Sequence, residues 1–521
     1  MTRCAGHDPP PSPRPLTQPH PTQLGVPRVL TTKAPIPMPG QALPATLTPH
    51  IGEQPNSGAA QRHASTVAIF AVPLLAVLIV ATRYNRTSYF YDEWSMLQRV
   101  LTTRSNVING ATLGYNGHLY VVCYFVYKAQ LALGLSNHAL IWIVFCASLV
   151  ALTVATTLVL RAGEVPLLPA LAAAVVITYF GPGAQLMTFE FQFTMNAALA
   201  CSLLAGFCLL TATHRRRSSL YIAALLLLAV LLDSATAFAG GLFIAMLMLL
   251  RQRDRWAIIA LAPSAFLGAL FTFVSHNALL AAPATINQRL AFAAHLTLLA
   301  LGGIAGGGQI VGALMLVLTV SALGWSLRAQ RLPRSTRDLV VAATVSALAM
   351  IAITTWSRAG LVRGDFFDFN RYISLVAIYC LLAVLPLAFR VLLSIPAVTA
   401  RTASMLLALL LTVVFILNAR PLTHYRATIE MWMAQTHALV AEATWTMSAS
   451  CSHSASLNYT ATPLGSVGPQ VTVALLYRLE HYGALTPPRQ PPVRPPVVSA
   501  AQWQNASDVC TSRPATLHSG K

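Results

Sequence analysis

The chain has 521 residues, of which 55% are hydrophobic and only 9% are charged. A soluble globular protein is typically about 25% charged, so this composition excludes an ordinary soluble enzyme, a disordered chain and a coiled coil, and leaves a polytopic membrane protein. In such a protein, the excess of 34 Lys and Arg over 15 Asp and Glu indicates cytoplasmic loops and lipid headgroups rather than nucleic acid as a partner.

The N-terminal segment has too few apolar residues to form a hydrophobic core. Residues 1–65 are rich in Pro, Thr and Gln and contain no sustained apolar run, which predicts a disordered tail. Five basic residues against Asp8 and Glu53 leave a net charge of +3. The positive-inside rule therefore places this tail in the cytoplasm.

Residues 66–418 alternate apolar runs with arginine clusters. Several runs are shorter than the roughly 20 residues that a span needs. They lie at 67–82, 119–134, 139–160, 167–180, 195–213, 219–232, 236–250, 256–274, 291–306, 309–327, 339–356, 373–389 and 403–418. The arginine clusters between them, expected in the cytoplasm, lie at 215–217, 251–255, 328–337 and 390–401.

Each run that spans the membrane moves the chain to its other side. The arginine clusters can therefore all lie in the cytoplasm only if two of the thirteen runs do not span the membrane. The weaker runs are 119–134, which contains Lys128, and 291–306, which leads into a flexible glycine-rich stretch. We therefore predict an all-α polytopic membrane protein with about 11 transmembrane helices (range roughly 10–13). The run at 119–134 becomes an interfacial helix of the first extracytoplasmic loop. The arginine-rich, lysine-poor composition is typical of GC-rich bacterial genomes, so the plasma (inner) membrane is the expected location.

On this topology the scarce polar motifs fall on the outer face. They are Tyr91-Asp92-Glu93-Trp94, Asn116-Gly117-His118, the segment from Gly181 to Gln192, Asp233-Ser234, Trp356-Ser357-Arg358 and the stretch from Arg363 to Tyr372. Glu190 lies between two phenylalanines, where a carboxylate is costly and therefore functional or paired.

Each of these motifs also has a simpler interpretation. Asp92 and Glu93 fit ordinary solvated loop charge, and Trp94 fits an interfacial aromatic belt. Asp233 fits a helix cap, and Arg371 fits a side chain that snorkels to the interface. The motifs indicate a site only when they are taken together.

Together these residues resemble the GT-C superfamily of membrane glycosyltransferases, which use polyprenyl-phosphate-linked sugars. In that superfamily an acidic motif, here Asp92-Glu93, begins a long loop after the first span, and that loop also carries helices along the membrane. The chain is similar, more narrowly, to a group of actinobacterial integral membrane proteins. The matching motifs are Asp92-Glu93-Trp94, Asn116-Gly117-His118, Gly181 to Gln192, and Arg371-Tyr372.

The resemblance implies transfer of a sugar from a polyprenyl-phosphate donor to an extracytoplasmic acceptor, which is an envelope glycan, a lipid or a protein. Asp92 would remove the acceptor proton and Glu93 would orient the acceptor or share that role. Arg358, Arg363 and Arg371 would stabilise the leaving phosphate, and His118 is the next candidate for that role. The remaining predicted substrate-binding residues are Glu190, Gln192 and Tyr372. No cofactor is required, and a divalent metal on Asp92 or Glu93 stays open.

Two other functions remain open at this point. A transporter or flippase for lipid-linked saccharides is one, and a noncatalytic membrane protein is the other. Residues 419–521 are expected to be a small, partly disordered extracytoplasmic region with a helix at 424–445, in which Cys451 and Cys510 either pair or stay free.

Overall fold

A computed structural model describes residues 57–83, 92–103, 106–112, 118–134, 139–211, 215–251, 255–274, 284–328, 332–360, 370–450, 475–476, 478–479, 485 and 488–507. The chain divides into two units, Met1–Pro55 and Asn56–Lys521. The first unit, with most of the predicted tail, lies outside the described residues. The first helix, α1, spans Ser57–Arg83 and so begins before the expected boundary at residue 65.

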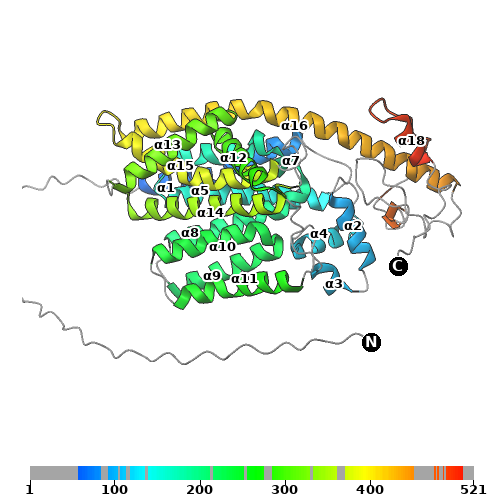
Figure 1. Cartoon of the computed structure of the whole chain (residues 1–521), viewed down its shortest axis with the longest axis horizontal. Coiled ribbons are helices and arrows are strands. Elements are labelled where there is room, and N and C mark those ends of the chain that lie inside the picture. The colour runs from blue at the N-terminus through cyan, green and yellow to red at the C-terminus, as the bar shows by residue number, and fades with distance from the viewer. Residues whose placement is uncertain are drawn as a thin grey trace, which may run out of the picture. The chain divides into compact units, whose positions relative to one another are not determined.

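The described part of the second unit is helical and has no β-strand. Its long helices lie alongside one another (Figure 1). They are α5 (Ala139–Ala162), α8 (Phe193–Thr211), α9 (Arg215–Leu232), α10 (Ser234–Leu250), α11 (Arg255–Val274), α13 (Gln309–Arg328), α14 (Arg334–Arg358), α15 (Asn370–Leu393) and α16 (Ala400–Ser450). Shorter elements are α2 (Asp92–Thr102), α3 (Val107–Thr112), α4 (Val121–Ala132), α6 (Leu167–Thr178), η1 (Gly181–Gly183), α7 (Ala184–Thr188), η2 (Glu190–Gln192), α12 (Ile286–Ile304) and α18 (Ala500–Ser507).

Within the described ranges, seven helices are long and apolar enough to cross a membrane, which indicates a membrane protein. The candidates lie in α1, η2 with α8, α13, α14, α15, α16 and α5. The pair α6–α7, bent by 44°, makes an eighth if it counts as one span. The expected number of about 11 is not confirmed, because the apolar parts of α9, α10 and α11 are shorter than a bilayer requires. Neither α4, with 12 residues, nor α12 is among the candidates.

The apolar surface of α13 supports this class of protein. Leu314, Val317 and Leu318 are each more than 60% exposed. A contiguous apolar face of this kind is unfavourable in water, whereas lipid chains solvate it without cost. The face therefore marks α13 as a helix at the lipid boundary.

Arginines gather at one end of the helices, which we call the arginine end. There the Arg390 guanidinium pairs with the Glu164 carboxylate, and Arg251 Nε lies 3.3 Å from Oδ2 of the buried Asp338. Arg334 is 3.9 Å from the same oxygen. Asp338 lies one turn after Arg334, the first residue of α14. These contacts join α5, α10, α14 and α15.

The arginine end yields a stability prediction. We expect Asp338→Asn to lower the unfolding free energy by roughly 1–3 kcal/mol, because it removes the charge that compensates the half-buried Arg251. Thermal unfolding of the purified protein in detergent measures this loss. Arg334→Ala is the matched control, because the Arg334 side chain is 63% exposed and an exposed pair contributes little. Equal melting temperatures for wild type and Asp338→Asn would contradict the prediction.

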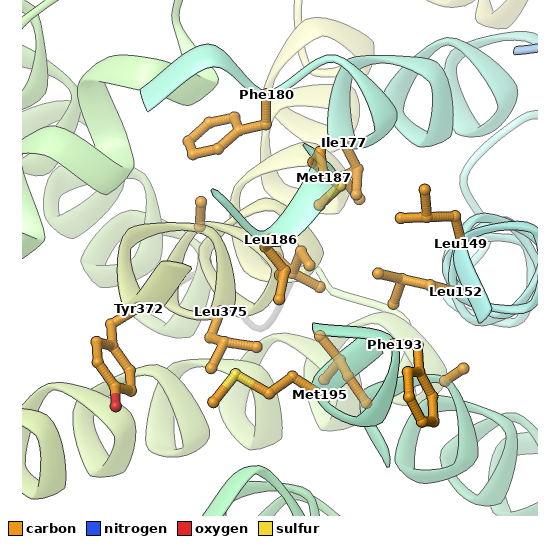
Figure 2. Close-up of a cluster of buried hydrophobic side chains, with 14 of the residues drawn as sticks. Leu149, Leu152, Ile177, Phe180, Leu186, Met187, Phe193, Met195, Tyr372 and Leu375 are labelled. Carbon is orange, nitrogen blue, oxygen red and sulfur yellow. The ribbon is translucent and has the colours of Figure 1, made fainter. Parts of the chain in front are cut away.

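The opposite end is built around the segment that joins α6 to α8. The Gln185 backbone N–H donates to Asn370 Oδ1 at 3.0 Å, and Ser374 Oγ donates to the Gly183 carbonyl at 2.8 Å. Figure 2 shows Leu186 and Met187 of this segment between Leu375 of α15 and the leucines of α5. The segment thus reaches the start of α15 as well as the start of α8.

The glycine-rich stretch after α12 is a tight turn in the structure, not the flexible segment expected. The Gly307 N–H donates to the Gly302 carbonyl at 2.8 Å, and Gly306 has φ +74°, which favours glycine. A Cβ atom on Gly303 would lie 2.5 Å from the Phe180 ring. Asn418 Nδ2 also donates to the Gly303 carbonyl at 2.9 Å. Close packing of the backbone explains why glycines occur here.

The C-terminal helix α16 differs from the expected division at residue 418. It contains 51 residues and continues through Pro421, which corresponds to a length of about 75 Å, well over the roughly 30 Å of a hydrocarbon core. Its C-terminal half extends beyond the neighbouring helices (Figure 1). Gln435 Nε2 donates to the Val497 carbonyl at 2.6 Å, and Ser507 Oγ donates to Glu442 Oε1 at 2.6 Å. Residues around α18 are therefore docked on α16.

Candidate functional site

The acidic motif after α1 opens a short helix rather than a solvated loop. Asp92 is the first residue of α2; its side chain lies outside the described part of the structure. Glu93 is 0% exposed, and its Oε1 accepts a hydrogen bond from the Tyr127 hydroxyl at 2.8 Å. Trp94 is also buried, at 2% exposed, so it belongs to the core rather than to an exposed aromatic belt. Figure 1 shows α2, α3 and α4 grouped at one end of the long helices.

An aromatic cluster brings Glu93 to the segment that holds Glu190. The Phe191 ring lies 6.4 Å from the Tyr127 ring and 5.4 Å from the Tyr120 ring, with the latter pair edge to face. Phe191 separates Glu190 from Gln192, and both of these side chains are 1% exposed. The aromatic rings therefore join Glu93 to the segment that carries Glu190, and both carboxylates are buried. A buried carboxylate is costly, so this arrangement favours a function.

His118 pairs with an aspartate that the sequence alone offered as a helix cap. Its Nδ1 lies 2.7 Å from Asp233 Oδ1, and both side chains are buried. Asp233 is also the N-cap of α10: it accepts hydrogen bonds from the Ala235 N–H at 3.2 Å and from Thr236 Oγ1 at 2.6 Å. The Tyr120 ring stacks on His118 with centroids 5.3 Å apart.

The charge state of Asp233 follows from these contacts. Burial alone raises the pKa of Asp233, because it disfavours the charged carboxylate. The His118 ring and the hydrogen bonds from Thr236 and Ala235 outweigh burial, so the pKa lies below the ordinary value of 3.8. Asp233 is therefore an ionised carboxylate at neutral pH.

Arginines form a second group at the junction of α14 and α15. The guanidinium carbons of Arg358 and Arg371 lie 5.9 Å and 5.2 Å from the centroid of the Tyr372 ring. These distances fit cation–π contacts. Tyr372 is only 5% exposed, and Figure 2 shows its side chain near those of Leu375 and Met195. Arg289, on α12, lies 4.2 Å from the Trp356 ring at the same end of α14.

The structure links the two groups through the backbone. Asn370, which precedes Arg371, binds the Gln185 N–H, and Gln185 lies in the segment that continues to Glu190 and Gln192. Glu93 and His118 thus contact one aromatic cluster, which includes Phe191 between Glu190 and Gln192. Arg358, Arg371 and Tyr372 lie at the helix junction that is bound to the same segment. Arg363, Asn116 and Gly117 lie outside the described residues, as do Cys451 and Cys510.

Asp233 and Arg99 are the notable residues that sequence reasoning did not select. Arg99 is 7% exposed, and its Nε donates to the Gly110 carbonyl at 2.6 Å. Its Nη1 and Nη2 have no hydrogen-bond partner among the described residues. Burial lowers the pKa of Arg99. The helical spacing of Trp94, Leu97 and Val100 was the available signal, since it predicts a packed helix instead of a loop.

The ranges that the structure describes contain no group of three His, Cys, Asp or Glu side chains placed to hold a metal ion. The fold and the site define a helical membrane protein with a buried acidic and aromatic centre at one end. Comparison of the chain with protein-family models, curated proteins and solved structures finds no match.

Proposed function

We propose that this protein transfers a sugar from a polyprenyl-phosphate-linked donor to an acceptor hydroxyl of an envelope glycan, a lipid or a protein. The observation that carries the proposal is the burial of Glu93 on an aromatic cluster that also contacts His118 of the His118–Asp233 pair and includes Phe191, the neighbour of the buried Glu190. Ionisable groups buried in a membrane protein are by default functional. In this proposal the short helices α2 and α4 are the interfacial helices that the resemblance implies.

The reaction assigns a role to each group. The acceptor oxygen bonds to the sugar C1 and loses its proton to Asp92, while Glu93, held by Tyr127, orients the acceptor. The bond from C1 to the phosphate oxygen breaks and its electron pair stays on the phosphate. Arg358, Arg363 and Arg371 stabilise the added charge. Glu190, Gln192 and Tyr372 shape the sugar and phosphate subsites.

Membrane orientation follows from the two ends of α10. Asp233 precedes its first residue and Arg251 follows its last, so the arginine end and the acidic centre lie at opposite ends of this helix. We place the arginine end in the cytoplasm by the positive-inside rule. Eleven spans follow if the bent pair α6–α7 and the helices α9, α10 and α11 also cross, with the N-terminus inside and the C-terminus outside.

Reporter fusions test this orientation. We expect a fusion at residue 216 to report a cytoplasmic position and a fusion at residue 430, in the outer half of α16, to report an extracytoplasmic one. A cytoplasmic signal at 430 would move the acidic centre to the wrong side for an envelope acceptor.

The activity is tested with membranes that contain the protein. Radiolabelled polyprenyl-phosphate sugars are supplied, and transfer to lipid, glycan or protein fractions is measured. Transfer by the wild type, absent from membranes without the protein, supports the proposal. Movement of the intact donor across the bilayer without transfer would instead identify a flippase, and neither transfer nor movement would favour a noncatalytic protein.

A further inference from the structure

We propose that His118, held by Asp233, binds the phosphate of the lipid-linked donor through Nε2 and stabilises it as the sugar leaves, with Asp233 acting as a positioning residue. This inference rests on the proposed function and deepens it. It gives the buried pair a role that neither helix capping nor general interface polarity supplies.

The contacts of Asp233 go beyond those of a cap. An N-cap aspartate needs one carboxylate oxygen to accept from a backbone N–H in the first turn. Here that bond, from Ala235, is 3.2 Å, whereas the contact with His118 Nδ1 is 2.7 Å, the length of a charge-assisted hydrogen bond. The shorter contact is the one that crosses from α10 to the residues before α4.

The orientation of the imidazole is held from several sides. Tyr120 stacks on the ring with an interplanar angle of 4°. The Leu119 N–H donates to Ser234 Oγ at 3.0 Å, which holds the neighbouring backbone against the start of α10. Because Nδ1 is engaged by Asp233, Nε2 is the ring atom left for a ligand, and no side chain in the described ranges hydrogen-bonds to it.

Charge decides which kind of ligand fits. Asp233 is 0% exposed, and an ionised carboxylate buried without a cation is strongly unfavourable. In the proposed complex the ring carries a hydrogen on both nitrogens, so that it offsets the charge of Asp233 at Nδ1 and presents an N–H at Nε2. That N–H donates to an anionic oxygen, so a phosphate group suits the site better than an acceptor hydroxyl. No proton needs to leave the ring during transfer, since the acceptor proton goes to Asp92.

Two substitutions at Asp233 distinguish its role as the N-cap of α10 from its role as the charged partner of His118. Asp233→Ser keeps a good N-cap residue and removes the partner of His118, whereas Asp233→Asn keeps the cap and an acceptor oxygen but removes the charge. We expect kcat for transfer to fall about 10²-fold in Asp233→Ser and in His118→Ala, and less in Asp233→Asn, with the acceptor KM unchanged. The double variant His118→Ala with Asp233→Ser should be no worse than either single variant, because the two residues act as one unit.

Thermal unfolding of each variant accompanies the kinetics. If Asp233→Ser lowers only the melting temperature and leaves kcat of the folded protein intact, Asp233 is a cap and the inference is wrong, although sugar transfer stands.

Binding of the phosphate is a second measurement that does not require turnover. Purified protein is titrated with polyprenyl phosphate, and with the uncharged polyprenol as a control. We expect His118→Ala to weaken binding of the phosphate lipid about tenfold, a loss of about 1.4 kcal/mol, and to leave polyprenol binding unchanged. If the wild type transfers no sugar but shows this difference, the phosphate site stands without the transferase. Equal affinities of wild type and His118→Ala for the phosphate lipid would overturn the inference.

Discussion

Asp92→Asn is expected to lower the rate of sugar transfer by about 10²–10⁴-fold, the usual contribution of a general base. The hydroxyl of the acceptor is a poor nucleophile, and an amide cannot take its proton. Asp92 is the first residue of α2, immediately before the buried Glu93, and the proposed mechanism makes it the group that takes the proton. Initial rates with a radiolabelled donor measure the effect.

Tyr127→Phe is the matched comparison for this experiment. It removes the 2.8 Å hydrogen bond to Glu93 Oε1 and leaves both carboxylates in place. We expect a loss of roughly 10–10²-fold, about the value of one hydrogen bond from a neutral donor to a charged group. Full activity in Asp92→Asn would contradict the assignment of the base, and the same loss in both variants would show that the effect comes from disturbed packing at the start of α2.

Arg371→Ala is expected to reduce kcat by about 10²–10³-fold, the cost of removing one charge-stabilising donor from a developing anion. The leaving phosphate gains negative charge as the bond to the sugar breaks, and the guanidinium at the start of α15 would stabilise that charge. Its position is constrained by the Tyr372 ring, 5.2 Å away, and by the neighbouring Asn370, which binds the Gln185 N–H. Kinetics over a range of donor concentrations separate kcat from KM.

Two variants control for general loss of positive charge. Arg371→Lys keeps the charge without the planar fork and should recover part of kcat. Arg289→Ala removes a comparable arginine that stacks on Trp356 at the same end of α14, and we expect less than a threefold change there, about the effect of losing a cation–π contact. A similar loss in Arg289→Ala and Arg371→Ala would indicate a diffuse field rather than a phosphate contact at Arg371.

Composition and local pattern already predicted the broad class of this protein. A charge content of 9% over 521 residues and repeated apolar runs require helices that bury their own backbone hydrogen bonds in lipid, and the structure has seven candidate spans. The number of spans was less predictable. The helices α9, α10 and α11 pack beside longer neighbours, so their apolar length does not by itself say whether they cross.

Contacts between residues that are far apart in the sequence could not be predicted from the sequence alone. Asp233 showed the local pattern of a cap, and it is one, yet its shortest contact with a nitrogen is to His118, 115 residues earlier. The sequence around Glu93 was also compatible with a solvated loop charge. In the structure Glu93 is buried, and its carboxylate accepts a hydrogen bond from the Tyr127 hydroxyl of α4. The position of the outer half of α16 likewise depends on residues around α18 that lie some 60 positions further along the chain.

The sequence by itself determined that this chain is a helical membrane protein, where its scarce carboxylates occur, and that Glu190 is out of place among phenylalanines. Hydrophobic content and periodicity are local properties, and they carry that information directly. Only the tertiary structure decided that Tyr127 joins Glu93 to Phe191, the neighbour of Glu190, and that His118 is held by Asp233. Such contacts depend on how helices from different parts of the chain pack, because the burial of a charge is set by the partners that packing brings to it.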